Sequence, residues 1–144
     1  MAGEGRAADV AHPQGGFAED TLGTLPRRQN PHMHLLEAFH ALAEATGEQR
    51  WLDHANAIVR LAREHLVDAG TDTLGEYFTD DWKQAPGAAG MVCEPGHHLE
   101  WTWLLLHHWR LTGDTEARDL AERLYGFAIR HGFDDGQAGP LAAF

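Results

Sequence analysis

The feature of this 144-residue sequence that most constrains its fold is an internal repeat at a spacing of 66 residues. Each copy contains two stretches of apolar residues at helical spacing, joined by a Thr-Gly turn. The repeat aligns, without a gap, Thr46 with Thr112, Gly47 with Gly113, Ala55 with Ala121, Ile58 with Leu124, His65 with His131, Asp68 with Asp134, and Gly70 with Gly136. The sequence therefore predicts an all-α chain of αα-hairpin repeats. Such hairpins must stack to bury their inner helices, and two are too few to complete a solenoid or a ring.

Four helices are expected, over residues 31–45, 48–67, 96–111 and 115–130. Asn30 and Pro31 form a helix-start signal, an N-cap residue followed by proline at the first helical position. Gly47 ends the first helix. The second and fourth helices are amphipathic, whereas the third is apolar nearly all round and is expected to be buried on most sides.

The helices divide the chain into two parts. Residues 1–29 have no sustained periodicity, and we expect an irregular N-terminal segment with one short strand around Phe17. Residues 30–144 form the helical domain, interrupted over 68–96 by an insertion. Within the insertion, residues 73–78 predict a short strand or hairpin.

Composition argues against several classes of partner. The formal net charge is -11, and no cluster of Lys and Arg could neutralise a run of phosphates, so we expect neither nucleic acid nor membrane as a partner. The single cysteine, Cys93, cannot form an internal disulfide, and the N-terminus has no apolar segment typical of a signal peptide. A cytoplasmic location is the resulting expectation.

The start of the third helix carries the residues best suited to chemistry. His97, Glu100 and Trp101 lie on one stripe at helical spacing. A carboxylate three residues after a histidine can accept its ring N–H and raise its basicity, as a proton-abstracting imidazole requires. The same spacing also suits a buried histidine satisfied by a neighbouring carboxylate for packing alone.

The first helix opens in an equivalent way, with Asn30 and His34 near its start. If the inner helices line a common cavity, these two residues converge there with His97 and Glu100. Because a helix that is apolar nearly all round is mainly a packing element, we assign Trp103 and Trp109 to the core. Trp101, on the His97 stripe, is kept as the indole that could face the C–H surface of a sugar. These groups outline a carbohydrate site.

Two motifs give a specific resemblance. They are Asn30-Pro31-His32-Met33-His34-Leu35-Leu36-Glu37-Ala38 and Glu94-Pro95-Gly96-His97-His98-Leu99-Glu100-Trp101. Together they resemble the N-acylglucosamine 2-epimerase family, to which the mannose isomerases and cellobiose epimerases belong. The similarity extends over residues 15–135 and includes the Thr-Gly turns and Asp81-Trp82.

The resemblance implies an (α/α)6 barrel, of which this chain would be about the middle third, and an isomerase or epimerase acting at C2 of a hexose or N-acylhexosamine. Histidines would move the proton through an enediol or enediolate, with no metal or redox cofactor. Carried over, His97 is the acid–base histidine and Glu100 the carboxylate that orients it. Asn30 and His34 would contact the sugar's oxygens. The family's second acid–base histidine and its substrate arginine have no counterpart in these residues.

Other hypotheses stay open at this stage. His32, His34, His97, His98 and Glu100 supply enough imidazole and carboxylate for a zinc site, although His32 and His34 diverge on a helix. The chain could also be an inactive fragment or binding remnant, whose exposed inner-helix faces would favour self-association. Cys93 has no activating base at a fixed spacing, so a nucleophilic role is not expected.

Overall fold

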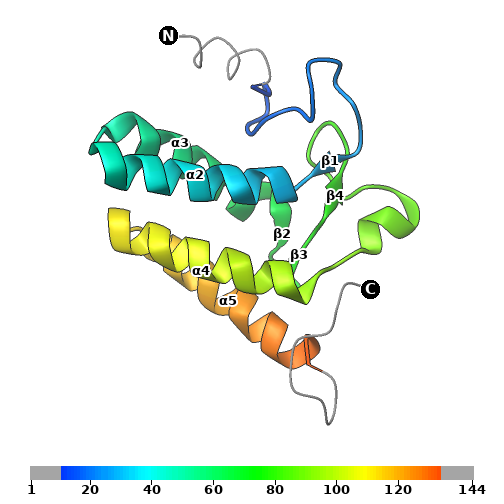
Figure 1. The fold of residues 1–144 in the computed structure, drawn as a ribbon. Helices are drawn as coiled ribbons and strands as arrows, with labels where there is room; N and C mark the ends of the chain where they lie inside the picture. Colours follow the sequence, from blue (N-terminus) through cyan, green and yellow to red (C-terminus); the bar gives the residue numbers. More distant parts are fainter. Residues whose placement is uncertain (1–10, 134–144) are drawn as a thin grey trace.

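The computed structural model describes residues 11–133 (Figure 1). Its elements are, in order, β1 (Arg27–Arg28), α2 (Asn30–Thr46), α3 (Gln49–Leu61), a π-helical turn (Ala62–Leu66), β2 (Val67–Asp68), β3 (Thr73–Leu74), β4 (Tyr77–Phe78), a 3-10 helix (Gly87–Met91), α4 (Pro95–Thr112) and α5 (Thr115–His131). The all-α architecture is confirmed, and each expected helix is present. Asp134 and Gly136 of the repeat lie outside the described residues.

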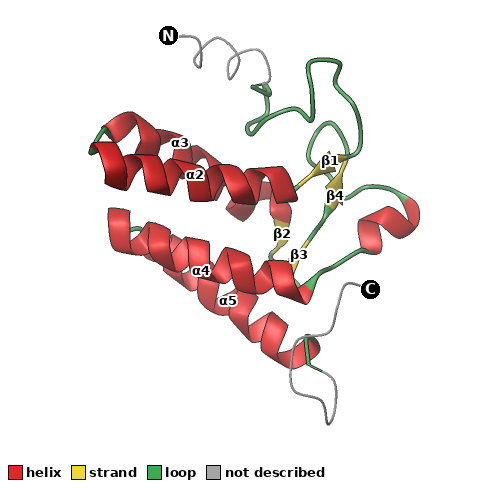
Figure 2. Ribbon diagram, viewed as in Figure 1, coloured by secondary structure: helices red, strands yellow, loops and turns green. Residues whose placement is uncertain are grey.

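The repeat folds as two αα-hairpins that lie side by side (Figure 2). α2 packs on α3, α4 packs on α5, and the inner helices α2 and α4 contact each other. Both hairpins turn at a glycine in the left-handed region, Gly47 at φ 70° and Gly113 at φ 77°. In each turn the preceding threonine, Thr46 or Thr112, donates its hydroxyl to the carbonyl four residues earlier at 2.7 Å. The shared Thr-Gly motif is therefore a helix-ending device.

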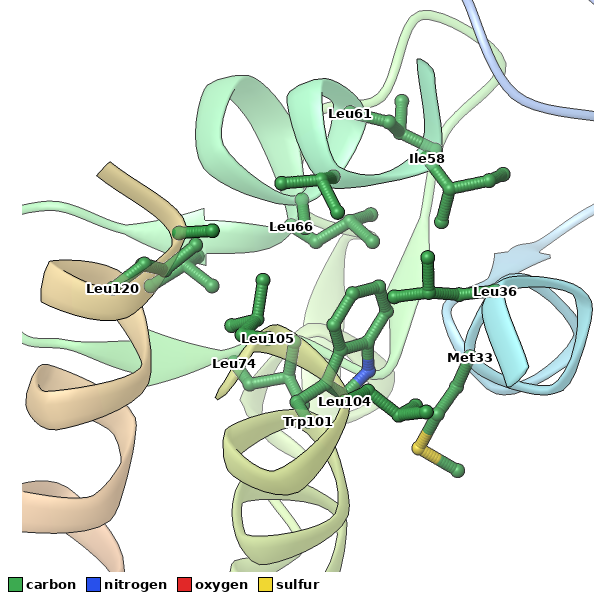
Figure 3. Close-up of a cluster of buried hydrophobic side chains, with 14 of the residues drawn as sticks. Met33, Leu36, Ile58, Leu61, Leu66, Leu74, Trp101, Leu104, Leu105 and Leu120 are labelled. Atoms are coloured by element: carbon green, nitrogen blue, oxygen red, sulfur yellow. The ribbon is translucent and has the colours of Figure 1, made fainter. Parts of the chain in front are cut away.

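The core joins both hairpins and the excursion between them (Figure 3). Its large members include Met33, Leu36, Ile58, Leu61, Leu66, Leu74, Trp101, Leu104, Leu105 and Leu120. Burial of each such side chain contributes about 1.5–3 kcal/mol to folding. The expectation that α4 is buried on most sides is wrong in one respect, because Trp103 is 58% exposed. Among the described helices, α4 contacts α2, α3 and α5, and these contacts leave the Trp103 indole exposed.

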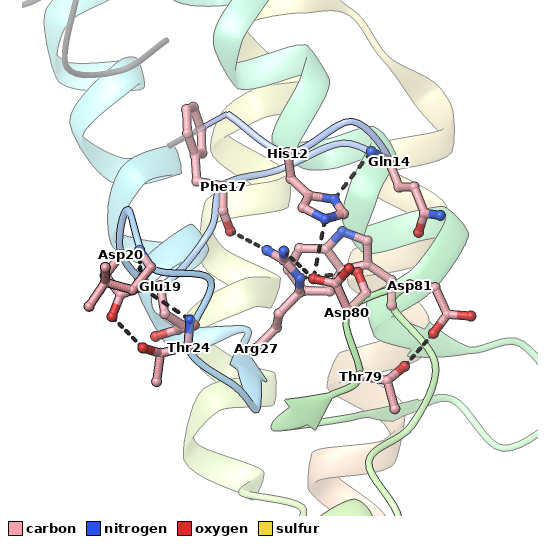
Figure 4. Close-up of polar contacts among 12 residues, drawn as sticks. His12, Gln14, Phe17, Glu19, Asp20, Thr24, Arg27, Thr79, Asp80 and Asp81 are labelled. Carbon is pink, nitrogen blue, oxygen red and sulfur yellow. Dashed lines mark hydrogen bonds and ion pairs between the residues drawn. The ribbon is translucent and has the colours of Figure 1, made fainter. Parts of the chain in front are cut away.

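The N-terminal segment is held by polar contacts to the insertion (Figure 4). Arg27 is buried, donates to the Phe17 carbonyl at 3.0 Å, and donates to the Asp80 carboxylate at 2.8 Å. The short strand expected around Phe17 is a single bridge between Ala11 and Phe17. Residues 11–29 are thus largely irregular but fixed against the rest of the chain.

The insertion contains strands that do not pair with each other as the expected hairpin would. β3 pairs antiparallel with β2, directly after the π-helical turn, and β4 pairs antiparallel with β1. Of the two alternatives expected for residues 73–78, short strands are present, but the hairpin is corrected to two separate two-stranded sheets. Each sheet ties the insertion to a different part of the chain, which fixes the segment between β3 and β4.

The start of α2 also differs from expectation. Gln29, not Asn30, occupies the N-cap position, and its side chain makes no capping hydrogen bond. Asn30 is the first helical residue and directs its amide elsewhere, as described below. Among the described residues, no helix is both long enough and apolar enough to cross a bilayer.

Candidate functional site

The candidate site lies where the starts of the two inner helices meet the insertion. α4 contributes His97 from its first turn, and Glu94 precedes that helix. The segment between β3 and β4 contributes Glu76, which is buried. Gln29, fully buried, leads into α2, and its backbone N–H donates to the Glu76 carbonyl at 3.2 Å. Three parts of the chain therefore converge on one imidazole.

Carboxylates surround one ring nitrogen of His97. The Nδ1 atom lies 3.0 Å from Glu76 Oε1 and 3.2 Å from Glu94 Oε2. The Glu76 hydrogen bond is the main cause of a raised His97 pKa, assisted by the negative charges of Glu76 and Glu94. Two acceptors at Nδ1 favour the tautomer that carries its proton there, an assignment made from the hydrogen-bond network.

Gln29 is oriented by its contacts with Trp101 and Glu76. The Trp101 indole N–H, which can only donate, reaches Gln29 Oε1 at 2.6 Å. The Gln29 amide nitrogen must then face the other way, where it donates to Glu76 Oε2 at 2.9 Å. It also lies 2.9 Å from His97 Nδ1, a close approach of two donors that share the Glu76 carboxylate. Trp101 thus fixes Gln29, and Gln29 fixes Glu76.

The second ring nitrogen of His97 is the chemically available one. Its Nε2 atom lies 3.3 Å from the Asn30 side-chain nitrogen, a long contact in which Asn30 donates. With the proton on Nδ1, Nε2 keeps its lone pair and can act as a base. Asn30 and His97, both predicted as site residues, are therefore brought together.

Glu100 does not take the position predicted for it. The carboxylates beside the His97 ring are Glu76 and Glu94, while Glu100 is exposed and affects the His97 pKa only as a minor, distant charge. The reason is tertiary, because the excursion inserts Glu76 ahead of the next turn of α4. The prediction that Glu100 orients His97 is corrected to Glu76, assisted by Glu94.

Glu100 and His34 instead share a groove between the two inner helices. The groove has a volume of about 350 Å³ and is lined by Met33, His34, Glu37, Leu99, Glu100, Trp103 and Leu104. His34 is exposed there and lies 3.5 Å from Glu37. Two predicted site residues thus face one concavity, one helical turn from His97.

Trp101 cannot serve as the sugar-facing indole that the sequence suggested. Its ring is fully buried and its only polar atom is used by Gln29. Trp103, assigned to the core from sequence, is the exposed indole beside the groove. The assignment from helical spacing was wrong because Trp101, one residue after Glu100, points into the core between the two hairpins.

The set of residues weighed as a zinc site is not assembled. His32 and His98 direct their ring nitrogens to the backbone: His32 to Arg28 O at 3.0 Å and Phe17 N at 2.9 Å, and His98 to Glu94 O at 2.9 Å and Leu74 N at 2.9 Å. A different group, Glu76, Glu94 and His97, has donor atoms within 4.8 Å of one another. These atoms already hold the imidazole, although together they offer a cation three ligands.

Sequence reasoning missed Gln29, Glu76 and, as a functional group, Glu94. Glu94 stands inside the quoted motif, three residues before His97, so helical spacing could have identified it. Glu76 comes from an irregular segment, and no spacing rule links it to α4. The Cys93 thiol has its pKa raised to about 11 by burial and by the two glutamates, which agrees with the expectation that it is not a nucleophile.

Comparison with known proteins places the chain in a family. The profile of the N-acylglucosamine 2-epimerase (GlcNAc 2-epimerase) family matches residues 4–144. The chain belongs to this family. It is 42% identical over 127 residues to a mannose-6-phosphate isomerase of Rhizobium meliloti (strain 1021), covering 87% of this chain and 33% of that protein. It is 34% identical over 140 residues to a D-mannose isomerase of Pseudomonas cannabina pv. alisalensis, covering 85% and 34%.

Solved structures show the same fold. A cellobiose 2-epimerase from Bacillus thermoamylovorans B4167 superimposes with a TM-score of 0.82 at 18% identity, over 97% of this chain and 37% of that one. A D-mannose isomerase superimposes with a TM-score of 0.73 at 23% identity, over 91% and 35%. The two hairpins are thus part of the helical barrel fold, and the chain spans about a third of the length of the curated relatives it matches.

Proposed function

We propose that this chain supplies the proton-transferring half of an isomerase or epimerase acting at C2 of a hexose or N-acylhexosamine. The observation that carries the proposal is the state of His97. Its Nδ1 proton is held by Glu76 at 3.0 Å, which leaves Nε2 as a base beside Asn30. Its relatives include mannose isomerases and a cellobiose 2-epimerase, which supports a sugar as the substrate.

In the proposed mechanism, His97 Nε2 takes the proton from C2 of the open-chain sugar. The electrons of the C2–H bond form the C1–C2 double bond, and the C1 carbonyl oxygen becomes an enediolate oxygen. The imidazolium that results is stabilised by the carboxylates of Glu76 and Glu94 on its other side. No metal or redox cofactor takes part in this step.

The product depends on where a proton returns. If His97 delivers it to C1 while the hydroxyl proton moves from O2 to O1, an aldose becomes a ketose. If a second group delivers a proton to the opposite face of C2, the sugar is epimerised. The described residues support the first half of either route, which the two share.

The groove between α2 and α4 is the proposed sugar site. Its volume of about 350 Å³ is at the lower end of the range for small-molecule pockets. His34 and Glu100 offer hydrogen bonds to hydroxyl groups, and the exposed Trp103 indole offers a flat apolar wall. Asn30, next to His97 Nε2, is placed to donate to an oxygen at the reacting end.

The decisive experiment uses a protein in which these residues are extended on both sides to the length of the relatives. Mannose, fructose and N-acetylmannosamine are incubated with it in deuterated water, and NMR follows incorporation of deuterium at C2 of the aldoses and at C1 of fructose. We expect His97→Gln to slow exchange by about 10²–10⁴-fold, the usual contribution of a general base. His54→Gln, on the exposed face of α3, is the matched control and should exchange normally.

Two results would contradict the proposal. Undiminished turnover in His97→Gln would show that another group moves the proton. Loss of activity on chelation, restored by a divalent metal, would instead favour a metal held by Glu76, Glu94 and His97. In that case the same residues would act as ligands rather than as a base and its supports.

A further inference from the structure

The donor atoms on the Nδ1 side of His97 meet the geometric requirements of a metal site. Glu76, Glu94 and His97 each offer one such atom, and the three lie within 4.8 Å of one another. Nδ1 is 3.0 Å from Glu76 Oε1 and 3.2 Å from Glu94 Oε2. Donor atoms held about 2.0–2.2 Å from zinc lie about 2.8–3.6 Å apart when the angles between ligands are about 90–110°. Both separations already fall in that range.

The charge of this cluster also favours a cation. The Glu76 side chain is only 5% exposed and that of Glu94 is 32% exposed. A carboxylate so deeply buried is costly unless it is paired. His97 is the basic partner of both glutamates, so a neutral imidazole leaves two negative charges on the cluster. A divalent cation would balance both.

The hydrogen bond from Gln29 leaves the required oxygen of Glu76 available. The Gln29 amide donates to Oε2 at 2.9 Å, whereas Oε1 is the oxygen that faces His97 Nδ1. A cation on Oε1 therefore keeps the Gln29 contact, which becomes a hydrogen bond to a metal ligand. The Gln29 amide nitrogen is also 2.9 Å from Nδ1 and has to shift away from it. One imidazole with two carboxylates suits zinc better than magnesium or calcium, which prefer oxygen ligands alone.

We propose that Zn²⁺ binds Glu76 Oε1, Glu94 Oε2 and His97 Nδ1, and that this binding inhibits proton transfer by His97. Zinc takes the lone pair of Nδ1, and the single proton of the neutral imidazole moves through solvent from Nδ1 to Nε2. No electron is transferred and no proton is lost. Nε2 is then a donor without a free lone pair, so it can no longer act as a base.

The position of the metal explains why it would block the reaction rather than assist it. Nδ1 and Nε2 point to opposite sides of the imidazole ring, and Asn30 marks the Nε2 side, where the sugar is proposed to bind. Zinc on Nδ1 would therefore not touch the reacting carbons. The inhibition rests on the proposed function, whereas the binding of zinc does not.

Calorimetric titration of the 144-residue chain with zinc chloride tests the site itself. We expect Glu94→Gln to lower the zinc affinity by at least about 10-fold, because loss of an outer-shell partner alone costs about 10–100-fold. Glu122→Gln, exposed on α5, is the matched control and should bind zinc normally. Cys93→Ser should also bind normally, and a loss of binding in this variant would mean that the thiol is a ligand and the assigned set is wrong.

Because the chain has 11 histidines, zinc bound elsewhere has to be recognised. Nitrogen-15 NMR of the histidine rings identifies the nitrogen that binds. We expect saturating zinc to convert His97 to the form protonated on Nε2. Binding unchanged in both Glu94→Gln and His97→Gln, or a His97 ring that does not respond to zinc, would mean an adventitious ion only and would overturn the proposal.

C2 exchange by the extended protein tests the inhibition separately. Zinc at full occupancy should slow exchange by about 10²–10⁴-fold, as loss of the general base would, and EDTA should restore it. Relative to its own zinc-free rate, Glu94→Gln should need at least about 10-fold more zinc for half inhibition. Exchange that is undiminished or faster with zinc bound at His97 would overturn the inhibition. An extended protein without exchange even in the absence of zinc would refute the proposed function, and calorimetry would still decide the zinc site.

Discussion

The two hairpins share histidines at equivalent positions that stabilise the fold, but they differ in the residues proposed for chemistry. His32 and His98 are equivalent in the repeat, and each donates Nδ1–H to the carbonyl four residues earlier and accepts a backbone N–H on Nε2. One position before each of them stand Pro31 and His97. Pro31 lies in the first turn of α2, whereas the equivalent position of the second hairpin holds the imidazole that contacts Glu76. The fold therefore requires the second histidine of His97-His98, and the proposed function requires the first.

The largest expected effect on activity comes from removing the hydrogen bond between Glu76 and His97, which the first hairpin has no counterpart for. In Glu76→Gln, the new amide can donate to Nδ1 and would force the proton onto Nε2, which removes the base. Replacement of a histidine's carboxylate partner by its amide costs about 10⁴-fold in the Ser-His-Asp triad, and we expect a loss of about 10²–10⁴-fold in C2 exchange by the extended protein. The free energy of unfolding of Glu76→Gln should change by much less than the activation free energy of C2 exchange.

A second readout distinguishes positioning from a structural role. Glu76 is the main cause of the raised His97 pKa, so NMR titration of the 144-residue chain should show a lower His97 pKa in Glu76→Gln. Glu94→Gln is the comparison variant, with a smaller decrease expected because its contact is longer, at 3.2 Å. An unchanged His97 pKa in Glu76→Gln would refute the assigned hydrogen bond.

The next effect concerns the equivalent histidines. His98→Leu leaves the Leu74 N–H without its ring acceptor and removes one of the two donors to the Glu94 carbonyl. His32→Leu removes the ring contacts of the Phe17 N–H and the Arg28 carbonyl in the same way. We expect each to lower the free energy of unfolding by about 2–4 kcal/mol. Urea denaturation measures this. The equivalence of the hairpins would fail if one variant were destabilised and the other were not.

The sequence predicted the helices well because local signals encode them, and it predicted the site only in part. Pro31, the Thr-Gly turns and the apolar periodicity act within a few residues, so helix ends follow from them. Glu76 reaches His97 through two small sheets that have no periodic pattern. Trp101 and Trp103 are both apolar residues on one helix, and only the position of the neighbouring helix decides which is buried. Long-range contacts thus decided the two corrections at the site.

A smaller effect, on the pH dependence of the free energy of unfolding, comes from the His40–His108 contact between the hairpins. Burial lowers the His40 pKa to about 3 and also lowers the pKa of His108, whose Nδ1 lies 3.0 Å from His40 Nε2. Among the described residues, His40 Nδ1 and His108 Nε2 have no hydrogen-bond partner. These rings take up protons only on unfolding, so their contribution to stability is present above pH 6.5 and is lost as the pH falls below it.

Urea unfolding at pH 7.5, 6.5 and 5.5 measures this dependence. We expect a loss of at most about 1.4 kcal/mol per pH unit for each such histidine. The raised pKa of His97 acts in the opposite direction, because it stabilises the fold at low pH and that contribution is lost as the pH rises through its folded pKa. His40→Leu combined with His108→Leu should flatten the acid side of the profile, and an unaltered slope would show that the pair does not cause it.

The smallest difference between the hairpins lies at the start of their outer helices. Asp114 caps α5 by accepting the N–H groups of Glu116 at 3.0 Å and Ala117 at 3.3 Å, whereas its repeat counterpart Glu48 makes no capping bond. We expect Asp114→Ala to cost about 1 kcal/mol in the free energy of unfolding, and Glu48→Ala less than about 0.5 kcal/mol.

Asp114→Asn keeps the cap but removes the charge near Arg63, so it separates capping from the ion pair. Glu48→Asp should transfer the cap to α3 and add a few tenths of a kcal/mol, if the two turns are as alike as their threonines and glycines indicate. A neutral Asp114→Ala would mean that α5 is held by packing alone, and that capping does not distinguish the hairpins.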